Sequence, residues 1–236
     1  MSKQTDLINV TDAITVSGSN VGIGTSSLDL VGSTTSLTLD HAGGNGQLSL
    51  KGNGTVYGRI FADNATGDLK MGNPTSNDVM FYTANLERMR IDATGAVTMP
   101  TQPAFLVRPS VGQTNLPNGV TTVIFGTEIF DQNSDFASNT FTAPVAGKYH
   151  LDANLWLEQV DTAINYLYLR LLTSNRNYND IISPRFSSDP TYWNFQCSVL
   201  ADMDAGDTAS VLYSQSGTSA QVDIGDKSFF SGYLVA

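Results

Sequence analysis

Short apolar–polar–apolar triplets recur through the first 102 residues, and this repeat constrains the fold more than any other feature of the sequence. The triplets are Leu37–Leu39, Leu48–Leu50, Leu69–Met71, Val79–Phe81, Met89–Ile91 and Val97–Met99. They start 8 to 11 residues apart, except for one double interval that contains the alternating segment 56–61. Segments rich in glycine, asparagine and aspartate lie between them and favour turns. Alternation with a period of two predicts short strands, each with one apolar face.

Strands this short cannot enclose a core within one chain, because each places only two or three aliphatic side chains on a face. Only four of the 22 aromatic residues precede Pro103. The apolar faces must therefore be buried against equivalent strands, either stacked along one chain as a β-helix or contributed by identical chains around an axis. The scarcity of aromatic residues favours a narrow shaft that three chains share. A small antiparallel domain of hairpins is the alternative.

The composition changes near Pro100–Pro103, where two prolines restrict the backbone. Thirteen of the 21 glycines precede Pro103, whereas 18 of the 22 aromatic residues follow it. We therefore predict an anchoring segment over residues 1–27, a fibrous β shaft over 28–102 and a separate head over 103–236.

The head shows longer alternating segments and no convincing helical periodicity. Nine strands are expected, at Ala104–Arg108, Val120–Phe125, Phe141–Ala143, Lys148–Leu157, Asn165–Leu172, Asn194–Leu200, Thr208–Tyr213, Gln221–Ile224 and Ser228–Val235. That number of strands with turn signals between them predicts a β-sandwich or jelly roll. The whole chain is expected to be all-β.

Charge and hydropathy exclude several classes of partner. The chain has 22 acidic and 12 basic residues, a net charge of −10 that is opposite in sign to that of an electrostatic nucleic-acid binder. The longest apolar stretch, Tyr166–Leu172, is interrupted by Arg170 and is far too short to span a membrane. The polar start shows no secretory signature, and Cys197 is the only cysteine, so no disulfide forms within the chain.

Five segments of the head resemble the globular head of complement component one-q and its tumour-necrosis-factor-like relatives. The segments are Ala104–Arg108, Val123–Phe125, Phe141–Tyr149, Met203–Val211 and Ser228–Val235. The most specific parts are the Phe-x-Ala-Pro-x-x-Gly-x-Tyr block and the Phe-Ser-Gly-Tyr-Leu ending. The resemblance implies a ten-stranded jelly roll that forms a tight homotrimer. This chain lacks the collagen stalk of that family, and the loop 175–191 is too divergent to carry over a ligand site.

Two segments of the first half are similar to repeats of phage fibre and virion-surface proteins. They are Asn20–Ser27 and Glu87–Val97. A fibrous repeat followed by a trimeric head is a fibre architecture, so the two resemblances support each other.

No set of residues indicates catalysis or a cofactor, and we predict neither. His41 follows a shaft triplet and is expected in an exposed turn, and His150 on a strand surface. No nucleophile elbow accompanies them, and Cys197 is expected to be a buried structural thiol. Asp202, Asp204 and Asp207 are weak candidates for calcium, since the family uses this Ala-Gly-Asp as a tight turn.

Two groups of residues are candidates for recognition and assembly. Exposed aromatic residues beside amides are typical of carbohydrate or protein contacts, which predicts recognition loops around Arg176, Tyr178, Tyr192 and Trp193. Capping of the jelly roll or filling of the threefold interface is the alternative for Tyr192 and Trp193. The candidates for a trimer interface are Trp156, Tyr166, Tyr168, Phe229, Phe230 and Tyr233.

These features predict a non-enzymatic structural protein of a phage virion. We expect a homotrimeric surface fibre, made in the host cytoplasm, that decorates or cements the capsid through its N-terminal segment and contacts the major capsid protein. The alternative is a tail fibre or adhesin, attached to tail components, whose head binds a host-surface glycan or protein. A secreted complement-type module and a polysaccharide depolymerase are more distant alternatives.

Overall fold

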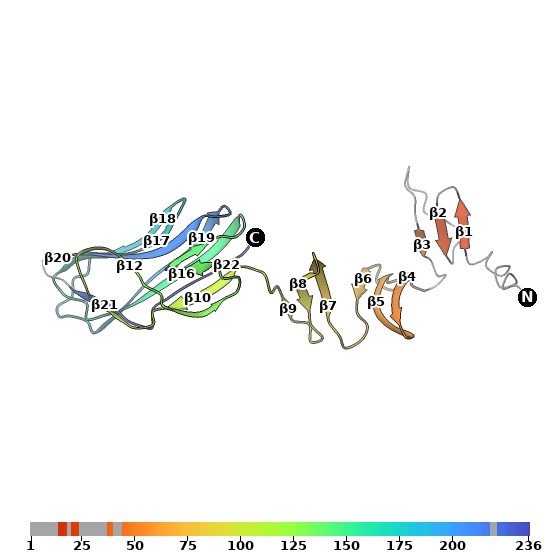
Figure 1. The fold of residues 1–236 in the computed structure, drawn as a ribbon, viewed down its shortest axis with the longest axis horizontal. Coiled ribbons are helices and arrows are strands. Elements are labelled where there is room, and N and C mark those ends of the chain that lie inside the picture. Colours follow the sequence, from red (N-terminus) through yellow and green to blue (C-terminus); the bar gives the residue numbers. More distant parts are fainter. Residues whose placement is uncertain (1–13, 18–19, 24–36, 40–43, 218–220) are drawn as a thin grey trace, which may run out of the picture. The chain divides into compact units, whose positions relative to one another are not determined.

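The computed structural model describes residues 14–17, 20–23, 37–39, 44–217 and 221–236 (Figure 1). The chain divides into two compact units, Met1–Met99 and Pro100–Ala236. The sequence places the junction three residues later, before Pro103. Most of the predicted anchoring segment 1–27, together with His41, lies outside the described residues.

The first unit consists of three small sheets of three strands each. Their strands are β1 (Ile14–Ser17), β2 (Asn20–Ile23) and β3 (Leu37–Leu39), then β4 (Gln47–Gly52), β5 (Thr55–Ala62) and β6 (Leu69–Gly72), then β7 (Val79–Thr83), β8 (Leu86–Ile91) and β9 (Val97–Thr98). Each of the six triplets lies in a strand, the last of them except for Met99. The β2–β3 pair is parallel, and the other pairs in these sheets are antiparallel.

Two tight hairpin turns fix the register of the second and third small sheets. Asn53 and Gly54 connect β4 to β5 with φ angles of 48° and 81°. Ala84 and Asn85 connect β7 to β8 in the same way, with φ angles of 51° and 60°. Positive φ at both central residues is the geometry that matches the twist of a two-residue hairpin, and asparagine and glycine adopt it readily.

The second unit is a sandwich of two mainly antiparallel sheets (Figure 1). Its strands are β10 (Ala104–Arg108), β11 (Gln113–Leu116), β12 (Gly119–Thr122), β13 (Thr127–Asp131), β14 (Phe136–Ala137), β15 (Thr140–Thr142), β16 (Gly147–Glu158), β17 (Ile164–Thr173), β18 (Asn177–Ile182), β19 (Tyr192–Met203), β20 (Thr208–Gly217), β21 (Val222–Ile224) and β22 (Phe229–Leu234). All nine predicted strands are present, whereas β11, β13, β14 and β18 were not predicted. The expectation of an all-β chain is confirmed.

The strand pairing of the second unit is nested, which defines a jelly roll. β10 pairs with β22 and β16 with β19 in one sheet, and β15 pairs with β20 and β17 with β18 in the other. Counted from the two ends of the second unit towards its middle, successive strand pairs therefore alternate between the two sheets. A long hairpin wrapped around the core produces this order. We call the sheet with β10, β13, β16, β19 and β22 the front sheet, and the sheet with β12, β15, β17, β18 and β20 the back sheet.

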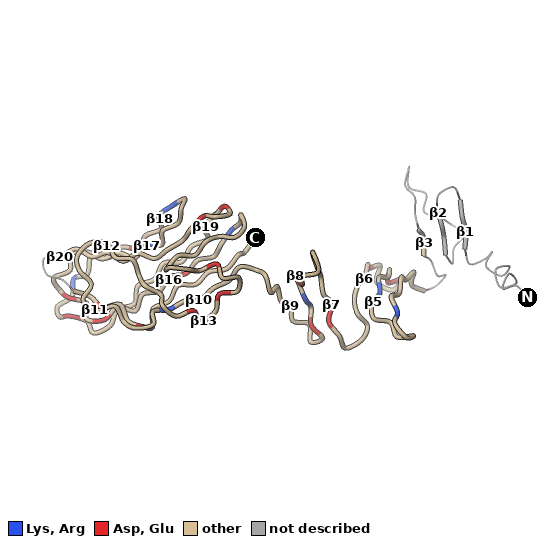
Figure 2. The backbone as a smooth tube through the Cα atoms, viewed as in Figure 1, with Lys and Arg blue, Asp and Glu red and all other residues tan. Residues whose placement is uncertain are grey.

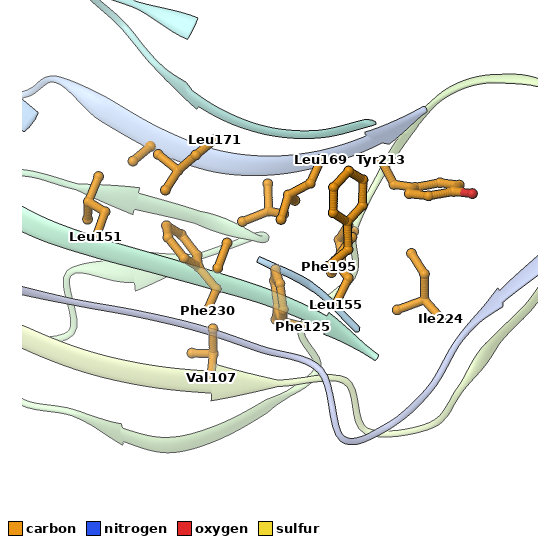
Figure 3. Close-up of a cluster of buried hydrophobic side chains, with 14 of the residues drawn as sticks. Val107, Phe125, Leu151, Leu155, Leu169, Leu171, Phe195, Tyr213, Ile224 and Phe230 are labelled. Carbon is orange, nitrogen blue, oxygen red and sulfur yellow. The ribbon is translucent and has the colours of Figure 1, made fainter. Parts of the chain in front are cut away.

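The core lies between the front and back sheets (Figure 3). Alternate residues of β16 and β17, from Tyr149 to Leu157 and from Leu167 to Leu171, point inward and are fully buried. Phe105 stacks on Phe141 with ring centroids 4.7 Å apart. Each buried side chain of this size contributes about 1.5–3 kcal/mol to folding. The second unit therefore has the core of an independent domain.

Candidate functional site

The sheet of β4, β5 and β6 has an apolar face that is open to solvent. Leu48 lies opposite Ile60, which lies opposite Met71, so the three side chains form a row across the sheet. Their exposed fractions are 46%, 42% and 62%. The other face of the same sheet is polar, with the Arg59 guanidinium 4.6 Å from the centre of the Phe61 ring. The sheet is thus amphipathic, as the triplets predict, but its apolar face is unburied.

The sheet of β7, β8 and β9 repeats this arrangement. Val79, Ile91 and Val97 form a row across its three strands, and Phe81 lies opposite Met89 on the same face. Arg90 points to the opposite face and pairs with both Glu87 and Asp78. The hydrogen bond from Arg90 lowers the pKa of Glu87. Among residues 44–99 of the first unit none is buried, although twelve large apolar side chains are exposed.

The front sheet of the head has a second apolar surface, on the side away from the core. Leu200 on β19 is 57% exposed, and Ile129, Phe130 and Tyr233 are exposed as well. Leu106, Ile129 and Phe229 line a hollow of about 600 Å³ beside Arg108 and Lys227. Exposed apolar patches of this kind mark interaction surfaces. We call this surface, from β13 to β19, the front face.

The predicted interface residues do not share one face of the head. Trp156, Phe229 and Tyr233 lie on the front face, because they alternate with buried neighbours on β16 and β22. Tyr166 and Tyr168 lie on the outer surface of the back sheet. The prediction for Phe230 is wrong, because its exposed fraction is 0% and it packs between the sheets against Phe105. Phe229 and Phe230 are adjacent in a strand, so only one of them can face outward.

The predicted recognition residues lie partly in strands, with Arg176 in the turn before β18, Tyr178 in β18, and Tyr192 and Trp193 in β19. The two groups lie at opposite ends of the head. Arg176 pairs with Asp202 near the end of β19, whereas Tyr192 begins that strand. Ten residues of strand separate Tyr192 from Asp202, a distance of about 33 Å at 3.3 Å per residue. The four candidates therefore cannot form a single recognition surface. Tyr178 and Trp193 pack partly against the core, as the capping alternative for Trp193 proposes, while Tyr192 is exposed beside Trp156.

The three aspartates proposed for calcium do not converge. Asp202 pairs with Arg176, and this hydrogen bond lowers the pKa of the carboxyl. Asp207 accepts hydrogen bonds from the Asp204 backbone N–H and the Asn175 amide, both at 2.8 Å, which closes the turn after β19. No group of three metal-binding side chains occurs among the residues that the structure describes. These hydrogen bonds agree with the interpretation of the segment as a tight turn between strands.

The histidine and cysteine of the head lie in positions without the partners that a nucleophile needs. His150 Nε2 is 3.2 Å from Ser198 Oγ on the front face. The neighbouring Asp152 instead accepts a hydrogen bond from the Gln196 amide at 3.1 Å, so no Ser-His-Asp chain forms there. Burial raises the pKa of the half-buried Cys197 thiol, and the charges of Asp180 and Asp152 raise it further. No helix in the described part of the chain could span a membrane.

The sequence matches no protein-family model and no curated protein. Among solved structures, the C-terminal part is similar to the globular domain of zebrafish complement 1qA protein, with 19% identity and a TM-score of 0.43, over 57% of this chain and 98% of that one. It is also similar to murine APRIL at pH 8.5, with 12% identity and a TM-score of 0.42, over 57% and 100% of the two chains. The likeness is one of fold alone.

The sequence analysis identified Trp156, Phe229 and Tyr233 on the front face but missed Ile129, Phe130 and Leu200. Ile129 and Phe130 lie on β13, which no alternation signal marked, because a bulge in the β10–β13 pairing interrupts the period. Leu200 lies in a predicted strand, but its outward direction depends on the pairing with His150. Strand alternation gives two faces, and only the neighbouring strands decide which one meets the core.

Proposed function

We propose that this protein is a non-enzymatic, homotrimeric surface fibre of a phage particle, with the first unit as shaft and the second as head. The single observation that carries the proposal is the exposure of the apolar side chains of the first unit. The sheets of β4–β6 and β7–β9 are amphipathic, yet no side chain of residues 44–99 is buried. A sheet with an apolar face needs a partner element against which that face is buried. Identical chains supply such a partner for every sheet at once.

The front face of the head supports the same assembly. It combines a 600 Å³ apolar hollow with exposed leucine, isoleucine, phenylalanine and tyrosine side chains. An interface that buried this face in each of three chains would resemble an obligate one, with more than about 2,000 Å² buried in total. C1q- and TNF-like domains typically form homotrimers, and the sequence motifs of the head point to that group.

The assignment to a virion rests on the resemblance of Asn20–Ser27 and Glu87–Val97 to phage fibre repeats. Capsid decoration needs only a short attachment peptide, and residues 1–27 would serve as one. The net charge of −10 per chain would keep neighbouring fibres apart on the particle.

Binding to particles tests the proposed attachment. Capsids of the encoding phage that lack this protein are mixed with the full chain or with a variant that lacks residues 1–27. The proposal expects the full chain to sediment with capsids and the shortened chain, still trimeric, to remain in solution. Equal binding of both, or binding only to isolated tails, would contradict capsid attachment through the N-terminal segment.

A receptor-binding fibre is the second candidate, because the head has a further surface with exposed tyrosines. Tyr166 and Tyr168 stand outside the core on the back sheet, away from the front face. A head whose front face joins three subunits would leave this surface free for a ligand.

A further inference from the structure

The outer surface of the back sheet has a column of stacked side chains. Tyr166 and Tyr168 are two residues apart on β17, and their rings are nearly parallel, 8° apart in angle with centroids separated by 6.0 Å. The Arg170 guanidinium lies next in the column, 5.1 Å from the centre of the Tyr168 ring. We call these three residues the tyrosine–arginine column.

Hydrogen bonds hold the arginine of this column in a fixed direction. Arg170 Nε donates to Asn179 Oδ1 on β18 at 2.9 Å, and Nη2 donates to the Tyr168 hydroxyl at 3.3 Å. Neither partner is a carboxylate. Among the described residues, no acidic side chain forms an ion pair with Arg170, whereas Arg108 and Arg176 both have aspartate partners. Arg170 is therefore an oriented cation whose charge is not neutralised by a neighbour.

The surface around the column is shallow and mixes polar with apolar side chains, since Ser214 is only 3% exposed and Ile181 is 64% exposed. Tyr168 lies opposite Ser214 and Tyr166 opposite Ser216 on β20. Tyr168, Arg170, Asn179 and Ile181 line a hollow of about 210 Å³, smaller than the roughly 300–1,000 Å³ of pockets that enclose a small ligand. A hollow this small gives little enclosure to the anchoring side chain of a protein partner, while Arg170 and Asn179 beside it offer hydrogen-bond donors. The surface is better suited to an extended ligand rich in hydroxyl groups.

We propose that this outer surface of the back sheet binds a carboxylate-bearing polysaccharide. The apolar face of a sugar ring would lie against the Tyr166 ring at the end of the column, because the Tyr168 ring lies between Tyr166 and Arg170. Sugar hydroxyls would pair with the Asn179 amide. The ligand carboxylate would meet the Arg170 guanidinium, which forms strong charge-assisted hydrogen bonds to such groups. A nucleic acid also stacks, but it carries a phosphate at every nucleotide, and one unpaired arginine in a chain of net charge −10 neutralises too few of them. The proposed site lies within one chain, so it does not depend on the trimer.

Binding of the full chain to arrayed oligosaccharides tests this assignment. The array carries sialic-acid and uronic-acid oligosaccharides, neutral oligosaccharides of equal length and a mixed-sequence single-stranded DNA. We expect binding to at least one acidic oligosaccharide, little binding to the neutral ones, and weakening in 0.5 M salt because the ion pair is exposed. Arg170→Gln should weaken binding about tenfold or more. A Tyr166→Ser, Tyr168→Ser double variant should abolish it.

Two matched variants control for charge and for exposed aromatic surface. Arg185→Gln removes one exposed positive charge elsewhere in the head, and Tyr192→Ser removes an exposed tyrosine from the front sheet. Both should bind as the parent does. The conservative Tyr168→Phe should stay within about threefold, since it keeps the ring.

Several results would overturn the proposal. They are the absence of binding to every acidic oligosaccharide, equal binding to neutral ones, preference for the DNA, or binding that survives both the Arg170 and the double tyrosine variant. The mass of each sample in solution is measured in parallel. A trimer that binds no glycan would refute this inference alone, and a monomer that binds one would refute only the trimeric assembly.

Discussion

Phe229 and Phe230 are adjacent in the sequence, yet they have different structural roles. The Phe230 ring lies within 5.0–6.2 Å of the rings of Phe105, Phe125 and Phe136, centroid to centroid. Phe229 points to the opposite side and lines the apolar hollow of the front face. Phe230 is therefore a determinant of folding, and Phe229 is available for assembly.

Truncation of Phe230 should therefore destabilise the head. We expect Phe230→Ala to lower its free energy of unfolding by about 3–5 kcal/mol, because a cavity replaces a buried ring. Guanidinium denaturation followed by tryptophan fluorescence measures the change, since Trp156 and Trp193 both lie in the head. Tyr166→Ala, an exposed aromatic residue on the back sheet, serves as the control and should cost less than about 1 kcal/mol. Equal losses for both variants would contradict the placement of Phe230.

The position of Phe230 also shows what the sequence could not determine. A period of two requires Phe229 and Phe230 to point to opposite sides, but it does not say which side is the core. That choice follows from the pairing of Phe230 with Ala153 on β16 and with Val107 on β10. Both partners are far away in the sequence, so local alternation cannot supply the answer.

At the scale of elements, the small sheets of the first unit agree best with the sequence. Each triplet became part of a strand because alternation and turn residues act locally, as at Asn53–Gly54. The prediction of the strands of the head was less complete. β18 was predicted as a recognition loop because Asn177, Asn179 and Asp180 are turn formers, yet its pairing with β17 overrides that preference.

The apolar row of β4, β5 and β6 gives a direct test of shaft assembly. We expect Leu48→Asp to dissociate the assembly or make it insoluble, because a charge would be placed where identical chains bury aliphatic groups. Ser49→Asp is the matched control, since Ser49 adjoins Leu48 and points to the polar face opposite Arg59. Size-exclusion chromatography with light scattering measures both. Unchanged mass for Leu48→Asp would exclude this face from the interface.

The ion pair between Arg176 and Asp202 connects the start of β18 to the end of β19, and it should be sensitive to pH. The pKa of Asp202 in the folded protein lies below its ordinary value of 3.8. The folded state therefore holds the proton less tightly, so the stabilisation is present above pH 3.8 and is lost as the pH falls through the lower folded pKa.

Substitution of Asp202 by asparagine should reveal this dependence. We expect Asp202→Asn to lower the free energy of unfolding at pH 7 by a small amount, and the difference from the parent to disappear as the pH falls through the lowered pKa of Asp202. Denaturation curves at pH 7, 5 and 3 measure it. Asp204→Asn, an exposed neighbour without an ion pair among the described residues, should show no such trend. A difference that grew as the pH fell would contradict the assigned pair.

At the scale of the whole molecule, the two units differ in what they can do alone. The head contains all 27 buried apolar residues found in the described part of the chain, and the first unit contains none. Charged positions occur along the described strands of the first unit (Figure 2), and three ion pairs lie there. Exposed ion pairs add little stability, so charge does not replace burial. The proposed association of identical chains would supply that burial.

The mass of the native protein at micromolar concentration tests this central claim most directly. One chain has a mass of 25.2 kDa, so sedimentation or native mass spectrometry should give about 76 kDa with no dependence on dilution. A stable trimer at this concentration is the expected result. A well-folded monomer of 25.2 kDa, with its first unit protected from proteolysis, would contradict it.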